Sequence, residues 1–157
     1  MSIPGIGERA AQAIIGEIGV DMTRFPTAAH LASWAGLCPG NHESAGKRKT
    51  GKTRHGNAAL CTVLVEAAWA TAHTKTRLGA RLRRLQRRMG KTAGPKAAVA
   101  VAHTILTIIW HLLTHGGTYH ELGADYYTRR EDPEALADRL KHKIEALGYT
   151  VALSLTA

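Results

Sequence analysis

Ser44 lies in a glycine-rich, strongly basic segment, residues 41–57, whose composition suits chemistry on a phosphate group. A serine hydroxyl attacks phosphorus only when a base removes its proton and cations stabilise the developing charge. The sequence identifies no such base. It does supply five cations after the serine: Lys47, Arg48, Lys49, Lys52 and Arg54. Ser44 is therefore a candidate nucleophile beside phosphate-binding side chains.

The same segment is predicted to be an exposed loop that binds a polyanion. Five like charges repel one another and cannot be buried without a counterion. Gly46, Gly51 and Gly56 interrupt the charges and let the backbone come close to phosphate oxygens. The alternative interpretation of Ser44 is an ordinary turn residue, which is common in loops of this composition.

Positive charge is concentrated in one part of the 157-residue chain, whose net charge is +9. From Ser44 to Lys91 there are thirteen Lys or Arg residues and one acid, Glu66, so this band carries +12. The rest of the chain has eight bases and eleven acids, or −3. Such a band favours a nucleic-acid surface. It does not favour a membrane surface, because no basic amphipathic helix with aromatic anchors accompanies it.

A zinc site is an alternative use of the residues around the basic loop. Cys38, His42, His55 and Cys61 are all possible ligands, but their separations match no common zinc finger. Two buried cysteines and two solvated histidines are the competing interpretation, and we predict no metal site. The low cysteine count is typical of a reducing cytoplasm.

The elements that must position these residues are predicted to be helices, so the fold class is mainly α, with no convincing sheet. Apolar residues recur at helical spacing in six stretches, Thr27 and Asp132 are candidate N-caps, and one helix is predicted to begin near Asn57. The predicted helices are a first ending at Gly19, a short one over 27–34, one from about 57 to 71, a basic one over 75–91, a core helix over 95–115 and a last one over 133–147. Residues 118–130 are predicted to be irregular, and 149–155 a short strand or a tail. We expect one domain over 1–130, with 131–157 as a helix and tail packed on it.

Two further places are candidate DNA contacts. Ile3–Gly7 reads Ile-Pro-Gly-Ile-Gly, the hairpin pattern of a helix-hairpin-helix element, in which Gly5 and Gly7 permit a tight turn and the next helix offers its amides to a phosphate. The basic helix is the second place, through Arg84, Arg87 and Arg88. A loop before a helix and a solvated helix face are the respective alternatives.

Taken together, the ordered motifs from Ile3 to about Val151 resemble the C-terminal domain of the insertion-sequence transposases of the 110/116/902 family. The matching motifs are Pro4–Gly7, Phe25 with Leu31–Gly40, Glu43–Arg48, Gly51–Arg54, Gly56-Asn57, Glu66–Ala70, Ala97–His103, Tyr119, Leu122–Tyr126 and Leu147–Tyr149. No single motif is decisive, but their common order makes the resemblance specific.

The resemblance implies a cytoplasmic, nucleoid-associated bacterial recombinase that acts on DNA, guided by an element-encoded RNA. It makes Ser44 the residue that attacks a DNA phosphate and links covalently to it. In the family, Mg²⁺ is held by an N-terminal nuclease-like domain, so we expect no cofactor in this chain and expect that domain, in cis or in trans, as a partner. A homo-oligomer is also implied. We expect the chain to be inactive alone.

The chain departs from the family pattern at Cys61, where family members commonly carry an arginine. If that arginine steadies a phosphate, its absence weakens the case for catalysis. Two other functions remain open: a non-enzymatic nucleic-acid-binding module that uses the basic loop and helix, and a small metal-stabilised protein built around Cys38 and Cys61.

Overall fold

The computed structural model describes residues 3–40, 42–50, 53, 55–90 and 94–154, without the side chains of 42–44 and 48–50. The described chain is mainly helical, as predicted. In chain order its elements are α1 Glu8–Ile18, the short 3₁₀ helix η1 Met22–Arg24, α2 Ala28–Trp34, β1 His42–Ser44, β2 Lys47–Thr50, α3 Ala58–Ala70, α4 Arg77–Met89, α5 Gly94–His115, α6 Tyr126–Arg129 and α7 Pro133–Glu145. They form two compact units, Met1–Ala124 and Asp125–Ala157.

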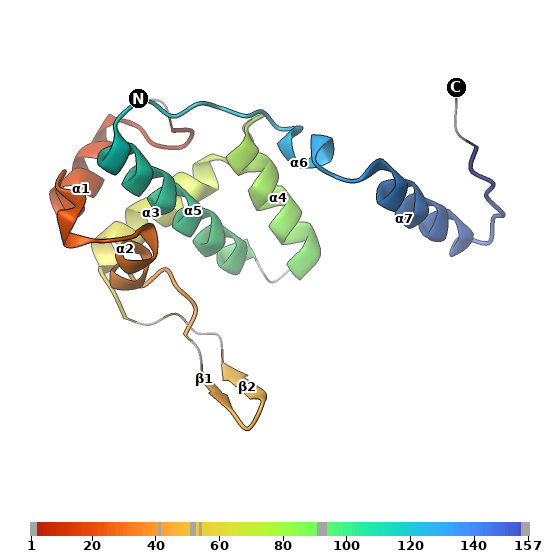
Figure 1. Ribbon diagram of the computed structural model, residues 1–157, viewed down its shortest axis with the longest axis horizontal. Coiled ribbons are helices and arrows are strands. Elements are labelled where there is room, and N and C mark those ends of the chain that lie inside the picture. The colour runs from red at the N-terminus through yellow and green to blue at the C-terminus, as the bar shows by residue number, and fades with distance from the viewer. Residues whose placement is uncertain (1–2, 41, 51–52, 54, 91–93, 155–157) are drawn as a thin grey trace. The chain divides into compact units, whose positions relative to one another are not determined.

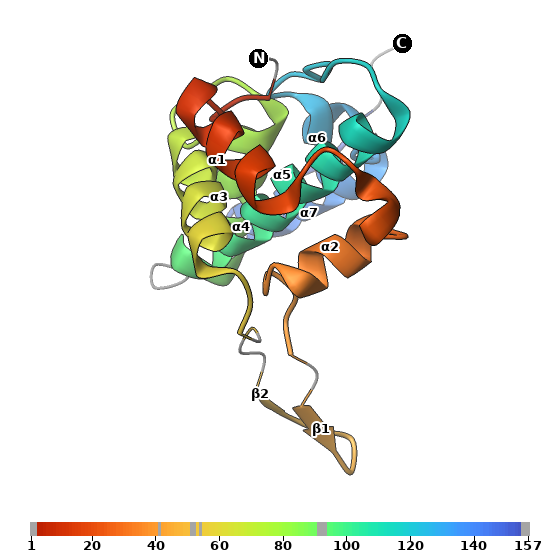
Figure 2. The same ribbon diagram turned by 90° about the vertical axis from the view of Figure 1, so that its left-hand side faces the viewer.

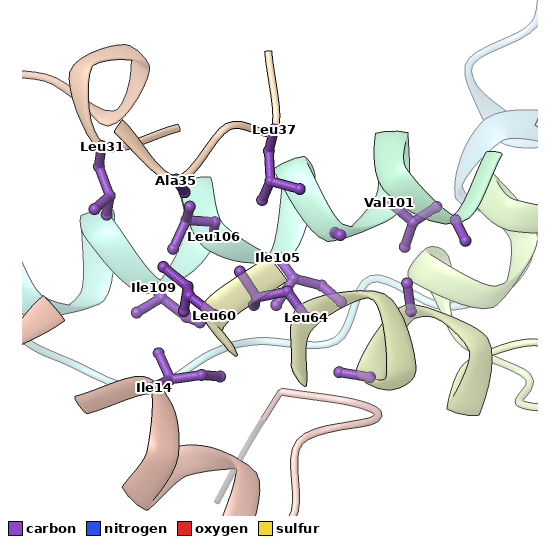
Figure 3. Packing of buried hydrophobic residues seen from close by; sticks show 14 of the residues in the cluster. Ile14, Leu31, Ala35, Leu37, Leu60, Leu64, Val101, Ile105, Leu106 and Ile109 are labelled. Carbon is purple, nitrogen blue, oxygen red and sulfur yellow. The ribbon is translucent and has the colours of Figure 1, made fainter. Parts of the chain in front are cut away.

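The first unit is built around α5, and α2, α3 and α4 all pack against that helix. Val101, Ile105 and Leu106 of α5 are fully buried, and Leu60 and Leu64 of α3 lie beside them (Figure 3). Burying branched apolar side chains at helical spacing is the main favourable contribution to such a core. By length and composition alone α5 is apolar enough to cross a membrane. Its packing instead confirms the prediction of a core helix.

Capping side chains define most helix starts where the sequence predicts them. Thr27 accepts a hydrogen bond from the His30 amide, Asn57 from the Leu60 amide and Asp132 from the Glu134 amide. Each bond satisfies a backbone N–H that has no partner within its own helix. Gly19, with φ of 73°, ends α1 as expected.

Two parts of the expectation were wrong. A two-stranded antiparallel sheet, β1 with β2, forms within the segment predicted to be a loop. The basic residues there leave no apolar alternation from which strands are recognised. In the stretch predicted to be irregular, residues 126–129 form the short helix α6.

The second unit contains α6 and α7 and has no buried residue in either helix. Within it, Arg129 contacts Asp125, and Arg139 contacts Glu131. The expected boundary at residue 130 lies five residues beyond the start of this unit. That the C-terminal helix packs on the rest of the chain stays a prediction.

Candidate nucleic-acid interface

Ser44 is the last residue of β1, at the tip of the β-hairpin. The strands pair with Ser44 opposite Lys47 and Glu43 opposite Arg48, and Ala45 and Gly46 form the two-residue turn. Both turn residues have positive φ, 50° for Ala45 and 72° for Gly46, as a type I′ turn requires. Alanine adopts this conformation at a cost of about 1 kcal/mol, so the turn beside Ser44 is strained.

The hairpin extends away from the helices of the first unit, between α2 and α3 (Figures 1 and 2). Lys47 is exposed at its turn. The side chains of Ser44, Arg48 and Lys49 are not described, although their backbones lie in the strands, and Lys52 and Arg54 lie outside the described residues. The register thus brings the candidate nucleophile and at least one cation to adjacent backbone positions.

The base of the hairpin is pinned to the helices by close contacts that the sequence did not suggest. A Cβ atom on Gly56 would lie 2.3 Å from the Gly36 nitrogen. The backbones on the two sides of the hairpin's base, at Gly36 and Gly56, can approach this closely only because Gly56 has no side chain. The Cys61 thiol donates to the carbonyl oxygen of Ala35 at 2.8 Å. Because these contacts hold the arms at the helix ends, the hairpin has a fixed root.

Asn57 adds a further restraint where the second arm enters α3. Its side-chain oxygen caps α3, and its Nδ2 donates to Glu17 Oε2 of α1 at 2.6 Å. The start of this helix near Asn57 was predicted from the sequence, but the cap and the hydrogen bond to Glu17, forty residues away, were not. Asn57 therefore both caps the start of α3 and links it to α1, where the chain passes from the hairpin into α3.

The basic helix α4 has a sharp division between its two faces. Leu78, Leu82 and Leu85 are buried in the core. The arginines predicted to bind DNA are all exposed: Arg84, Arg87 and Arg88. In both views α4 ends toward the side of the first unit from which the hairpin projects (Figures 1 and 2). Two of the three predicted contact regions thus share one side of that unit.

Not every arginine of α4 is available for a ligand. Arg83 Nη1 donates to the carbonyl oxygens of Ala72, at 2.7 Å, and Thr74, at 3.1 Å, and so ties α4 to the preceding turn.

Glu121 Oε1 accepts from the Arg77 amide at the start of α4. An acid at this position compensates the positive end of the helix dipole.

The N-terminal segment contains the predicted tight turn. The Ile6 amide donates to the Ile3 carbonyl, and Gly5 has φ of 86° in the turn. A Cβ on Gly5 would lie 2.3 Å from the Ala67 carbonyl oxygen, so the turn packs closely on α3. Gly7 has ordinary extended φ and serves as the N-cap of α1, which corrects the expectation that it forms part of the turn. The helix-hairpin-helix element and the DNA contacts of both glycines stay predictions.

The described side chains give no support to the alternative of a zinc site. Among them, no three His, Cys, Asp or Glu residues lie close enough together to hold a metal ion. His42 falls outside that set, because its side chain is not described. Partial burial raises the pKa of both Cys38 and Cys61, which keeps these thiols protonated and unreactive near neutral pH.

Residues 1–83 match the family model described as transposase IS116/IS110/IS902 family. The chain is 32% identical over 120 residues to the transposase for insertion sequence element IS1111A of Coxiella burnetii, covering 75% of this chain and 33% of that protein. It is 31% identical over 121 residues to a probable family 20 transposase of Pseudomonas aeruginosa, covering 76% and 36%. A 43.6 kDa protein of insertion element IS110 from Streptomyces coelicolor is 35% identical over 122 residues, covering 76% and 29%.

The chain spans about a third of the length of these curated relatives. No solved structure matches it significantly. The family model covers more than half of the chain, including α1, α2, the β-hairpin, α3 and the first half of α4. The chain with the serine-tipped hairpin and the arginine-rich α4 therefore belongs to the IS116/IS110/IS902 family of transposases.

Proposed function

We propose that this chain is the serine-bearing, DNA-binding part of an insertion-sequence transposase. The observation that carries the proposal is the position of Ser44 at the tip of a projecting, basic β-hairpin with a fixed root. A nucleophile must reach a phosphate on the backbone of a DNA duplex. A two-residue turn at the end of two strands is narrow enough to do so, and the hairpin cations would neutralise the phosphate.

In the proposed reaction the Ser44 hydroxyl oxygen attacks a DNA phosphorus. A P–Oγ bond forms, the bond from phosphorus to one deoxyribose oxygen breaks, and the departing oxygen takes up a proton. The serine proton passes to a base that this chain does not identify. Lys47, across the hairpin from Ser44, would stabilise the negative charge on the phosphoryl oxygens.

The proposal includes partners outside this chain. We assign the metal-dependent step, with Mg²⁺, to a nuclease-like domain in the same polypeptide or in a second chain. The family resemblance and the length of the relatives support this assignment. The same resemblance supports an element-encoded guide RNA, a homo-oligomer and a cytoplasmic, nucleoid-associated location. Without that domain we expect this chain to bind DNA and not to cut it.

DNA binding is tested by the dependence of duplex affinity on salt. A 20-base-pair labelled duplex is titrated with the protein at several NaCl concentrations. Replacing Lys47, Arg48 and Lys49 by Gln should reduce the slope of log affinity against log salt by about three, since each lost phosphate contact removes about 0.9. The matched control replaces Arg139, Lys141 and Lys143 of α7, where Arg139 and Lys141 already contact Glu131 and Glu145. Equal slopes in wild type and hairpin variant would reject the hairpin as a DNA contact.

The nucleophile is tested with the complete reaction: this chain, the nuclease-like domain, guide RNA, Mg²⁺ and labelled cognate DNA. We expect a protein–DNA adduct that survives denaturation, with the DNA attached to the peptide containing Ser44. Ser44→Ala should abolish the adduct, and Ser33→Ala, at an exposed serine of α2, should not. An adduct that persists in Ser44→Ala would refute the assignment.

A non-enzymatic nucleic-acid-binding module is the second candidate, and the absence of acids from the sequence of α4 favours it. No Asp or Glu occurs from Ala67 to His120, so the six arginines of α4 have no acidic partner on their own helix or on α5. Such a module would bind duplex with the salt dependence above and form no adduct in the complete reaction. Adduct formation therefore separates the two functions.

A further inference from the structure

Two basic side chains lie together where α4 packs against α5. Arg81 of α4 and His103 of α5 are both half-buried, and the charge of Arg81 acts directly on His103. Burial and the neighbouring Arg81 together lower the pKa of His103. Because α4 and α5 contain no acid, no carboxylate on these two helices compensates the charge of Arg81. The seam between them is thus a partly desolvated site of positive potential.

The half-buried arginines of α4 differ in their partners. Arg83 donates to two backbone carbonyls, and the Arg77 side chain hydrogen-bonds with the Tyr119 hydroxyl. The Nε atoms of Arg77 and Arg81 are both buried and have no hydrogen-bond partner among the described residues, and of these two arginines it is Arg81 that lies beside His103. A buried donor without an acceptor costs free energy, and more so when it is charged. An anion at the seam would supply the missing acceptor after a small rotation of the guanidinium.

We propose that Arg81 and His103 form a subsite for one phosphate group of a bound nucleic-acid strand. The inference rests on the proposed DNA binding and specifies where one strand lies. Arg84 and Arg88 follow Arg81 by three and seven residues, so they share its side of the helix, and both are exposed. A strand that enters at the seam would continue along α4 past these arginines, toward the side from which the hairpin projects (Figure 1).

The subsite predicts a pH dependence with a definite sign. In the free protein the lowered pKa leaves His103 mostly neutral near pH 7. A bound phosphate stabilises the imidazolium and raises that pKa, so binding takes up a proton. Affinity must therefore fall as the pH rises from the free to the bound pKa of His103, by up to about tenfold per pH unit.

Burial lowers the pKa of His103 first, and Arg81 is the charged side chain that lowers it further. On α5 itself the other basic and titratable residues are Lys96, His111 and His115. The remaining elements packed on α5 contribute Arg24, His30 and Glu66, and the lowered pKa of His103 owes nothing to them.

The first experiment measures the His103 pKa by NMR in the wild-type protein, with and without a 20-base-pair duplex. We expect the duplex to raise the His103 pKa. This measurement needs no variant, so loss of folding cannot confuse it. An unchanged His103 pKa in the saturated complex would overturn the subsite.

The second experiment measures duplex affinity from pH 5.5 to 8 in variants. Arg81→Gln should weaken binding about tenfold and reduce the salt slope by about one. His103→Gln should bind like the wild type at pH 8 and lose the gain in affinity at low pH. The matched controls Arg139→Gln and His111→Gln should change neither property.

The results separate this inference from the proposed function. If the wild type binds duplex and both subsite variants match it at every pH, the subsite is rejected and DNA binding through the hairpin stands. If the wild type does not bind duplex at low salt, the proposed function fails and the subsite fails with it.

Discussion

Helices α4 and α7 have the same length and nearly the same apolar pattern, and their surroundings are opposite. Each has thirteen residues and begins at a capping side chain, Thr76 or Asp132. In α4 the leucines at helical spacing are fully covered by α5 and its neighbours. In α7 no residue is buried, and Leu140 and Ile144 are 48% and 41% exposed. Apolar periodicity therefore identifies a helix without identifying what covers it.

The charges of the two helices differ in a second way. Helix α4 has six Arg and no acid, whereas α7 mixes both signs and pairs them, Arg139 with Glu131 and Lys141 with Glu145. Paired surface charges are screened and need no outside partner. A helix that carries charges of one sign and no acid of its own favours binding of a polyanion. The mixture of signs along the helix, more than its total charge, is what distinguishes α7 from α4.

The largest expected effect follows from the difference in burial. Leu82→Ala in α4 should lower the free energy of unfolding of the first unit by about 2–5 kcal/mol, through lost burial and the cavity left behind. Leu140→Ala in α7 should change it by less than about 0.5 kcal/mol. Urea unfolding followed by tryptophan fluorescence reports this, because Trp34, Trp69 and Trp110 all lie in the first unit.

A large loss of stability in Leu140→Ala would contradict the difference in burial between α4 and α7, because the apolar face of α7 would then be covered in solution. Dependence of that loss on protein concentration would identify a second copy as the cover. A concentration-independent loss would support the prediction that the C-terminal helix packs on the same chain.

Sequence reasoning succeeded where a local signal determines the outcome. The caps at Thr27 and Asp132, the start of α3 near Asn57, the core helix around Val101 and Ile105, and the tight turn at Gly5 each depend on a few neighbouring residues. It failed at the β-hairpin, because the sequences of the two strands, His-Glu-Ser and Lys-Arg-Lys-Thr, have no alternation of apolar and polar residues. Strand pairing there depends on the Ala45-Gly46 turn, and Ala-Gly is a weak turn signal.

The candidate site was only partly predictable for a related reason. Exposure of Arg84, Arg87 and Arg88 follows from the leucine seam on the opposite face of α4, which the sequence displays. The close approach of Gly56 to Gly36 and the hydrogen bond from Cys61 to Ala35 join residues 20 or more positions apart. No local pattern encodes such contacts. The family resemblance pointed to Cys61 but not to its hydrogen bond.

A second, smaller effect separates the arginines by their partners. Arg83→Gln should lower the stability of the first unit by about 1–2 kcal/mol, because the carbonyls of Ala72 and Thr74 lose a charged donor. Arg139→Gln should leave the same unfolding transition unchanged, since its ion pair with Glu131 is on the surface of the other unit. Urea midpoints measured by tryptophan fluorescence compare the two. An unchanged stability of Arg83→Gln would mean that water can satisfy the two carbonyls in place of the guanidinium. Arg83 would then not be needed for stability, and it would be added to the arginines proposed to bind DNA.

The smallest effect concerns the caps, and it tests whether α7 is cooperative with the rest of the protein. Thr76→Ala removes the hydroxyl that accepts from the Gly79 amide and should cost the first unit about 1 kcal/mol. Asp132→Ala removes an equivalent acceptor at α7. An isolated helix of thirteen residues is marginal in water, so losing its cap should reduce the helical signal in circular dichroism without moving the tryptophan transition. A tryptophan transition that moves equally in both variants would show that α7 unfolds together with α4, and the contrast between the two helices would then lie in their charges alone.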